Sequence, residues 1–270
     1  MGDAEDPRTL REYWARSGLG AAILDALNAS GKDLDALTVD DLAPMDQFHG
    51  GGMAMTRRLA RLGELGPDMR VLDVGGGLGG PARTLAAEFG CNVTLSDVTE
   101  SYIQAAKMLT GLVGSATSVT YLVADGLELP FDSGAFDVVW TQNSSMNIAS
   151  KEMLFEGFHR VLRPGGRLVT QEPMAGHVQP LIFPVMWASD PSASFLRKPE
   201  EMRKVIEAAG FRVRAWEDTQ AVKAPENEPL PSVRIQTLVM GDKLEQINAA
   251  GRRNNAEGRV VMVQAVFDRL

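Results

Sequence analysis

The spacing of hydrophobic positions along the chain changes near residue 69. Residues 1–68 carry apolar positions at helical intervals, such as Leu19, Ile23 and Leu27, and show no strand-like alternation. Beyond residue 69, short apolar runs alternate with helical segments, a pattern typical of a parallel sheet with helices on both faces. Strands are expected at 69–73, 93–97, 119–124, 136–141, 167–172, 211–217 and 259–267, and helices at 81–89, 100–113, 151–162, 199–209 and 230–250.

Two irregular parts of the chain are expected to cover the sheet. The helical segment 1–68 is predicted to form a lid ahead of a Rossmann-like α/β domain over residues 69–270. Residues 173–198 are rich in proline and too long for an ordinary connection, so they are interpreted as a cap insertion. The polar stretch 251–258 is predicted to be a solvated loop.

Composition and charge narrow the class of protein. With 270 residues the chain can bury one sizeable core. Its 27 Lys and Arg residues against 35 Asp and Glu residues give a formal net charge of −8, which argues against a nucleic-acid partner. No apolar run reaches the ~18 residues of a membrane span, and the acidic first residues do not resemble a secretion signal, so we expect a cytoplasmic protein without membrane contact. The assembly state, including a homodimer, stays open.

The sequence gives little support for a metal site or a disulfide bond. The single cysteine, Cys91, lies in an apolar stretch and cannot form an intramolecular disulfide or a cysteine-based metal site. No cluster of His, Asp and Glu has the spacing of metal ligands, so no metal is expected.

The segment 71–80, which reads VLDVGGGLGG, ends a predicted strand and opens a predicted helix. Glycines there allow a close approach to a ligand, and the helix N-terminus favours a negative group, so a nucleotide cofactor is implied. The spacing of Gly75, Gly77 and Gly80 also fits a dinucleotide site. Asp73 argues against that reading, because a carboxylate there would repel a pyrophosphate, whereas it would attract the ammonium group of S-adenosylmethionine.

Two further acids follow neighbouring strands. Asp97 ends the second strand, where a carboxylate could accept both hydroxyl protons of a ribose; as an alternative it is an ordinary surface acid. Asp125 follows the third strand beside Gly126 and could accept from the amine of an adenine; an Asx turn explains it about as well.

Taken in order, five motifs resemble those of class I S-adenosylmethionine-dependent methyltransferases: 73–79, 97–100, 124–126, 136–140 and 162–166. Within that class, the sequence DQFHGG at 46–51 and the long stretch after Glu172 resemble the glycine/sarcosine/dimethylglycine N-methyltransferases. The resemblance implies a seven-stranded Rossmann-like sheet whose last strand is antiparallel, with S-adenosyl-L-methionine as cofactor. The residues expected to bind this cofactor are Asp73, Gly75, Gly76, Gly77, Gly79, Asp97, Val98, Asp125, Gly126 and Gln142.

Methyl transfer from a sulfonium requires alignment, a dry pocket and an unprotonated nucleophile. The segment after the fourth strand should face the transferred methyl group, and Asn143 could orient an acceptor, although turn formation explains it equally well. His49 is the first candidate for a base or an acceptor-positioning group, with anchoring of the lid as its alternative. Glu172 could hold a cationic amine or take a proton, or pair with a structural arginine. His159 is assigned to structure, and His177 is expected to be solvated.

The sequence therefore predicts an enzyme that methylates a nitrogen of a small-molecule acceptor. The alternatives are O-methylation of a phenolic or natural-product acceptor, an NAD-dependent oxidoreductase, which the glycine spacing supports and Asp73 opposes, and a binding protein that has kept the fold without the activity.

Overall fold

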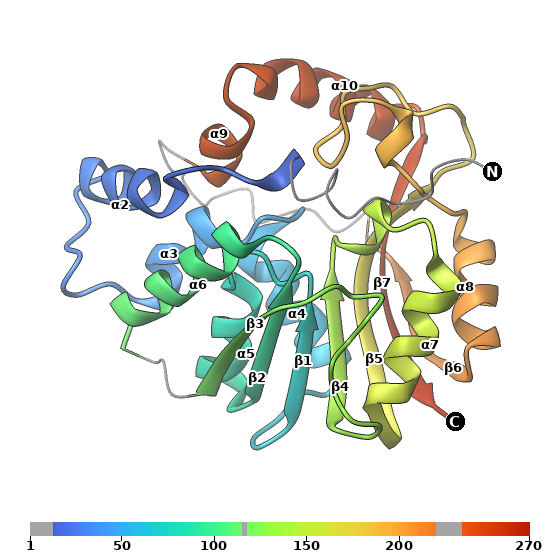
Figure 1. The fold of residues 1–270 in the computed structure, drawn as a ribbon. Coiled ribbons are helices and arrows are strands. Elements are labelled where there is room, and N and C mark those ends of the chain that lie inside the picture. The colour runs from blue at the N-terminus through green and yellow to red at the C-terminus, as the bar shows by residue number, and fades with distance from the viewer. Residues whose placement is uncertain (1–12, 115–117, 220–233) are drawn as a thin grey trace.

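The computed structural model describes residues 13–114, 118–219 and 234–270, which form one sheet covered by helices on both faces (Figure 1). Its strands are β1 (Arg70–Val74), β2 (Asn92–Asp97), β3 (Val119–Val123), β4 (Phe136–Gln142), β5 (Leu162–Ala175), β6 (Phe211–Asp218) and β7 (Val260–Arg269). They lie in the order β3-β2-β1-β4-β5-β7-β6. The first five are parallel, and β7 runs antiparallel between β5 and β6. The predicted seven-stranded Rossmann-like sheet is confirmed.

The helices alternate with the strands as the periodicity predicts. They are α2 (Leu19–Ala29), α3 (Val39–Asp46), α4 (Gly52–Leu62), α5 (Gly80–Phe89), α6 (Glu100–Leu112), α7 (Lys151–Val161), α8 (Pro199–Ala208), α9 (Ile235–Met240) and α10 (Leu244–Ala256). The single helix expected over 230–250 is divided, since Gly241–Lys243 separate α9 from α10, and its residues 230–233 lie outside the described residues. In the described ranges, no helix is both long and apolar enough to cross a membrane.

Apolar side chains on each face of the sheet hold these layers together. On one face, Leu59 of α4 and Leu85 of α5 pack with Val71 and Val138 of the central strands. On the other, Phe158 of α7 packs with Leu168 of β5 and with residues of α8. Strands buried on both sides are continuous apolar runs, which is why the sequence pattern located them.

A third apolar cluster lies beyond the carboxyl ends of the parallel strands. There Ile23 of α2, Leu42 of α3, Leu109 of α6 and Val239 of α9 pack together. Figure 1 shows α2, α9 and α10 above the ends of the strands. The segment before β1 therefore contributes α2 and α3 to this cover and α4 to a face of the sheet; its division from residues 69–270 as a separate lid stays a prediction.

The prediction for residues 251–258 is wrong. Residues 251–258 are not a solvated loop, because α10 continues through Ala256 and ends near Gly258, whose φ of 67° suits glycine. Gly251, which resembles a helix-ending glycine in the sequence, lies inside the helix. As a result, this stretch takes part in the cavity described below.

Candidate active site

The glycine segment after β1 leaves its backbone open to a ligand. Gly75 and Gly77 have φ values of 71° and 54°, which other residues adopt with strain. A Cβ atom at Gly77 would meet nothing nearer than the ring of Tyr102, at 3.9 Å. Gly75 and Gly76 line the same cavity as Gly77, whereas Gly79 does not line it and instead precedes α5 with a φ of 80°.

Beneath this segment lies a carboxyl group that lacks a hydrogen-bond partner. Asp73 is 1% exposed, and its Oδ2 accepts no hydrogen bond from any described residue. Burial, followed by the nearby charge of Asp97, raises the pKa of Asp73 to about 8. Because Asp73 also lines the cavity, a cation bound there would favour its ionised form.

Asp97 at the end of β2 is held in place by backbone amides. Its Oδ2 accepts from the amide of Gly77 at 3.0 Å and its Oδ1 from that of Thr99 at 2.8 Å. Each carboxylate oxygen keeps a second lone pair for a ligand. Burial raises the pKa of this carboxyl as well, against the effect of the amides. Val98 lies beside it on the cavity wall.

Asp125 takes part in a turn and also lines the cavity. Its Oδ1 accepts from the amide of Leu127 at 2.9 Å, which is the Asx turn considered from the sequence. It nevertheless lines the cavity together with Gly126, on the same side as Asp97. The turn fixes the direction of the carboxylate at this edge of the sheet.

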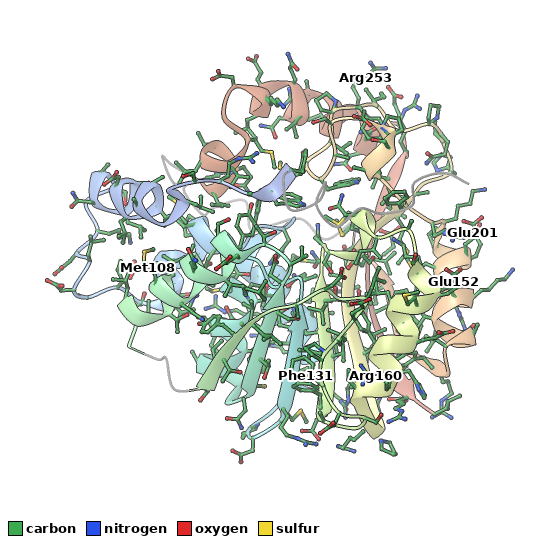
Figure 2. The ribbon with its side chains drawn as sticks, in the orientation of Figure 1. Met108, Phe131, Glu152, Arg160, Glu201 and Arg253 are labelled. Atoms are coloured by element: carbon green, nitrogen blue, oxygen red, sulfur yellow. The ribbon has the colours of Figure 1, made fainter. Side chains whose placement is uncertain are left out.

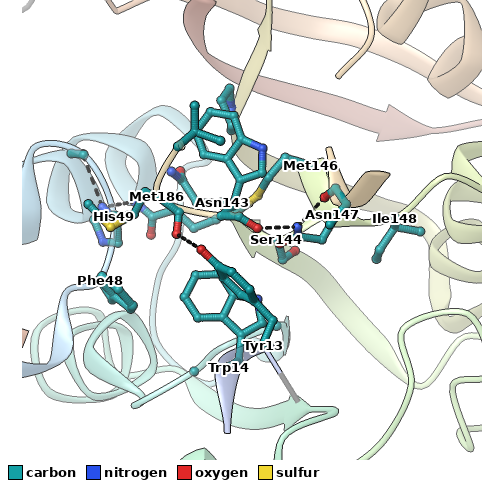
Figure 3. Close-up of a pocket in the computed structure, with 18 of the residues that line it drawn as sticks. Tyr13, Trp14, Phe48, His49, Asn143, Ser144, Met146, Asn147, Ile148 and Met186 are labelled. Atoms are coloured by element: carbon teal, nitrogen blue, oxygen red, sulfur yellow. Dashed lines mark hydrogen bonds between the residues drawn. The ribbon is translucent and has the colours of Figure 1, made fainter. Parts of the chain in front are cut away.

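His49 lies on the cavity wall within a network of side chains (Figure 3). Its Nε2 is 2.9 Å from Oε1 of Gln47, and its Nδ1 is 3.2 Å from Nε2 of Gln142. Nδ1 also lies 3.3 Å from the carbonyl oxygen of Gly50, so each ring nitrogen has an acceptor to which a neutral ring can donate. Burial lowers the pKa of His49 to about 4, so the imidazole is neutral near pH 7. The arrangement suits positioning better than proton abstraction.

The loop after β4 is fixed from below by Glu172. Oε1 of Glu172 accepts from the amides of Ser144 and Ser145, both at 3.2 Å. Glu172 is not one of the described residues that line the cavity. Its carboxylate contacts the loop instead. Asn143 does line the cavity; its φ is 56°, and its Oδ1 accepts from Nε2 of Gln171 at 3.3 Å.

The two other histidines lie away from this wall. Nε of Arg269 donates to His159 at 3.3 Å, and the His159 ring packs edge-on against Phe211, which agrees with a structural role. His177 packs against Gly258, where an added Cβ would meet its ring.

The sequence reasoning missed a buried ion pair beside the glycine segment. Nη2 of Arg83 on α5 lies 2.8 Å from Oδ2 of Asp46 at the end of α3, and both side chains are at most 1% exposed. Nη1 of Arg83 also donates to Thr110 on α6. Oδ1 of Asp46 is buried without a partner among the described residues, and Asp46 is one of the residues that line the cavity. The available signal was that Asp46 is the first residue of the motif 46–51, which also contains His49.

The residues described above as wall residues surround one cavity of about 1310 Å³ over the carboxyl ends of the strands. Figure 3 shows Tyr13 and Trp14 facing it across from Met146 and Asn147. The hydroxyl of Tyr13 donates to the carbonyl of Met186 at 3.3 Å and so joins the N-terminal segment to residues 173–198. A ligand in this cavity would be covered by both segments that the sequence predicted as covers.

Comparisons with known proteins identify the family to which the chain is related. Residues 72–170 match the family described as "Methyltransferase domain". The chain is 30% identical over 223 residues to the sarcosine/dimethylglycine N-methyltransferase of Halorhodospira halochloris, covering 80% of this chain and 76% of that one. It is 32% identical over 132 residues to the glycine/sarcosine/dimethylglycine N-methyltransferase of Actinopolyspora halophila, but spans 23% of that longer protein.

Solved structures extend the likeness of fold to the whole chain. The geranyl diphosphate C-methyltransferase of Streptomyces coelicolor, solved with S-adenosyl-L-homocysteine, superposes with a TM-score of 0.70 at 20% identity. The match covers 100% of both chains. The comparisons favour a methyltransferase over the dehydrogenase that the glycine spacing alone would allow.

Proposed function

Because the chain belongs to the S-adenosylmethionine-dependent methyltransferases, we propose that it transfers the methyl group to a nitrogen atom of a small-molecule acceptor. The relatives that methylate sarcosine and dimethylglycine support nitrogen as the target. The observation that carries the proposal is the buried carboxyl of Asp73, which has an unpartnered oxygen beside the open glycine segment.

The residues at the carboxyl ends of β1, β2 and β3 fit the parts of this cofactor. Asp73 would face the ammonium of the methionine end, and the amides of the glycine segment would face its carboxylate. Asp97 keeps lone pairs for the ribose hydroxyls, and Asp125 would accept from the adenine amine. When bound, the cofactor supplies a methyl group on a sulfonium, which an acceptor can displace in line.

The acceptor side needs orientation and exclusion of water. Gln142 and Asn143, at the end of β4, lie on the cavity wall next to the cofactor side. His49 holds the amide of Gln142 and stays neutral near pH 7, so we assign it a positioning role. A phenol would require a base, and an imidazole with a pKa of about 4 is a weak one, so this geometry favours an acceptor nitrogen that is already unprotonated.

Mass spectrometry of the purified protein for S-adenosylhomocysteine, followed by incubation of labelled cofactor with paired amines and phenols, tests this proposal. We expect label on the amines and not on the phenols. An Asp97→Ala variant should bind the cofactor more weakly by ~1–3 kcal/mol in calorimetry, because the charged partner of the ribose is lost. Transfer to phenols alone, or no binding of the cofactor, would refute the proposed function.

A further inference from the structure

The cavity is larger than a short amino acid and a cofactor require. Its volume of about 1310 Å³ exceeds the roughly 300–1,000 Å³ of ordinary small-molecule pockets. The cofactor side is bounded by β1, β2 and the segments that follow them. The remainder extends past Met146 toward residues 185–195 and α10. An acceptor of a few carbon atoms would leave much of this space to water.

The walls of this remaining part are mainly apolar. Four segments contribute to them: the loop after β4, residues 185–195, α10 and β7. The side chains involved include Met146, Met186, Trp187, Phe195, Ile247 and Met262. Methionine side chains adapt to irregular apolar ligands, and tryptophan offers a broad contact area. The chamber therefore suits an elongated apolar body.

The segment that forms one wall is tied to α10. Asn254 is 1% exposed; its Nδ2 donates to the carbonyl of Ile182 and its Oδ1 accepts from the amide of the same residue, both at 2.9 Å. Asn147 donates from Nδ2 to the carbonyls of Trp187 at 2.9 Å and Ala193 at 2.8 Å. These bonds fix residues 182–193 between α10 and the loop after β4, so the chamber is built into the fold.

One side of α10 brings a cation to this chamber. Asn248, Arg252 and Asn255 lie three or four residues apart on the helix and line the cavity. Arg252 is the one Lys or Arg among the described lining residues, and its side chain, like those of Asn248 and Asn255, is also exposed to solvent. By contrast, its neighbour Arg253 is paired with Glu257 at 3.1 Å and points outward (Figure 2).

The charges of the cavity are distributed unevenly. Asp97 and Asp125 lie on the cofactor side without a cationic partner among the described lining residues, whereas Asp46 is paired with Arg83 and Asp73 would face the ammonium of the cofactor. The remaining carboxylate of the described wall, Asp190, accepts from the amide of Ser192 at 2.8 Å and from its hydroxyl at 2.5 Å, and so stabilises its own turn. An acidic group on the acceptor would be repelled from the cofactor side and attracted to α10.

Building on the proposed function, we propose that the acceptor is an elongated, mainly apolar amine that carries an acidic group, either a carboxylate or a phosphate, and that Arg252 binds this group. The guanidinium can donate two parallel hydrogen bonds to either anion. The amides of Asn248 and Asn255 offer additional donors beside it. Arg252 would then turn the amine end of the acceptor toward the cofactor.

Binding of matched probes to the protein loaded with S-adenosylhomocysteine tests this inference. The probes are a long-chain fatty acid with a terminal methylamino group, the corresponding alkyl phosphate, the neutral carboxamide of the fatty acid, and sarcosine. We expect the acid or the phosphate to bind about fivefold or more tightly than the carboxamide, and sarcosine to bind most weakly. Whichever anion binds more tightly identifies the acidic group.

Substitutions on α10 assign the effect to one side chain. Arg252→Gln should remove the preference for the acidic probe and leave the carboxamide within about twofold, whereas Arg253→Gln, on the outer face, should change neither. Equal binding of acid and carboxamide by the unsubstituted protein, equal weakening of both by Arg252→Gln, or sarcosine binding as tightly as the long-chain acid would overturn the inference. Methyl transfer to the probes is measured separately from their binding. A failure of the proposed function would appear as missing transfer, and a failure of this inference as missing preference for the acidic probes.

Discussion

Acidification should weaken cofactor binding through Asp73. In the free protein, burial and the charge of Asp97 raise the pKa of this carboxyl to about 8, so most molecules carry a proton there at pH 7. A bound ammonium and sulfonium would favour the carboxylate and lower that pKa. Binding must therefore release the proton, and the affinity for S-adenosylmethionine depends on pH.

The size of the effect follows from the pKa. Below pH 8, each unit of pH lowers the ionised fraction of Asp73 about tenfold, so the Kd should rise about tenfold from pH 7 to pH 6. At pH 7, the binding of one cofactor molecule should release close to one proton from the protein. Above pH 8 the α-amino group of the ligand itself loses its proton, with a pKa of about 8, and the affinity falls again. The acid side of the profile is therefore the diagnostic one.

Isothermal titration calorimetry in two buffers of different ionisation enthalpy measures both the Kd and the released proton. An Asp73→Asn variant should bind about tenfold or more weakly and lose the dependence between pH 6 and 7. An Asp125→Asn variant removes another carboxylate from the same cavity wall and should keep that dependence. A flat Kd between pH 6 and 7 in the unsubstituted protein, together with no released proton, would refute the reasoning.

The stability of the free protein provides an independent check of the same pKa. Because folding raises the pKa of Asp73 above its ordinary value of 3.8, the folded state holds this proton more tightly, and its contribution to stability is lost as the pH rises from about 4 to about 8. Asp73→Asn should therefore stabilise the free protein by about 2–5 kcal/mol more at pH 9 than at pH 5, relative to the unsubstituted chain. Thermal unfolding at both pH values measures this difference, and equal effects at both would contradict it.

Two further outcomes concern the residues around the glycine segment. Arg83→Met leaves Asp46 buried without its partner and should lower the free energy of unfolding by about 3–5 kcal/mol. Arg57→Met removes a more exposed pair and should lower it by about 1 kcal/mol or less. Equal losses of the two variants in urea unfolding would be inconsistent with the buried pair. His49→Ala should lower turnover about tenfold while the cofactor Kd stays within about twofold, because the ring positions Gln142; unchanged turnover would leave His49 a purely structural residue. The pH–rate profile should also show no His49 ionisation near pH 6.5, since its pKa is about 4.

Local pattern predicted the sheet closely because its strands are buried on both faces. Six of the expected strands agree with the structure to within one or two residues at each end. The exception is β5, which begins at Leu162 where the prediction began at 167. Its early part contains Pro164 and two glycines, residues that normally mark a turn, yet Leu162 pairs with Phe136 of β4.

The end of α10 is predicted too early from the sequence, because glycine and polar residues are signs of a loop. A glycine followed by arginines and asparagines is typical of a loop, but Ile247, Ala250 and Asn254 give this helix a buried side beyond Gly251. Tertiary packing therefore extends the helix. The consequence for function is direct, because the extension places Arg252 on the cavity wall.

The cofactor side and the acceptor side of the cavity differ in how far the sequence can predict them. Asp73, Asp97 and Asp125 each follow a parallel strand, so the strand pattern alone brings them to one edge of the sheet. The acceptor side draws on segments far apart in the sequence, joined by bonds such as that from Tyr13 to Met186, which spans 173 residues, and no local pattern specifies such contacts. The two sides meet at the loop after β4. Glu172 of β5 accepts a hydrogen bond from Ser144 of this loop, and Asn147 of the loop donates one to the carbonyl of Trp187 in the cap. A substitution of Glu172 would therefore disturb acceptor geometry through Ser144 and Ser145 without any contact between Glu172 and the acceptor.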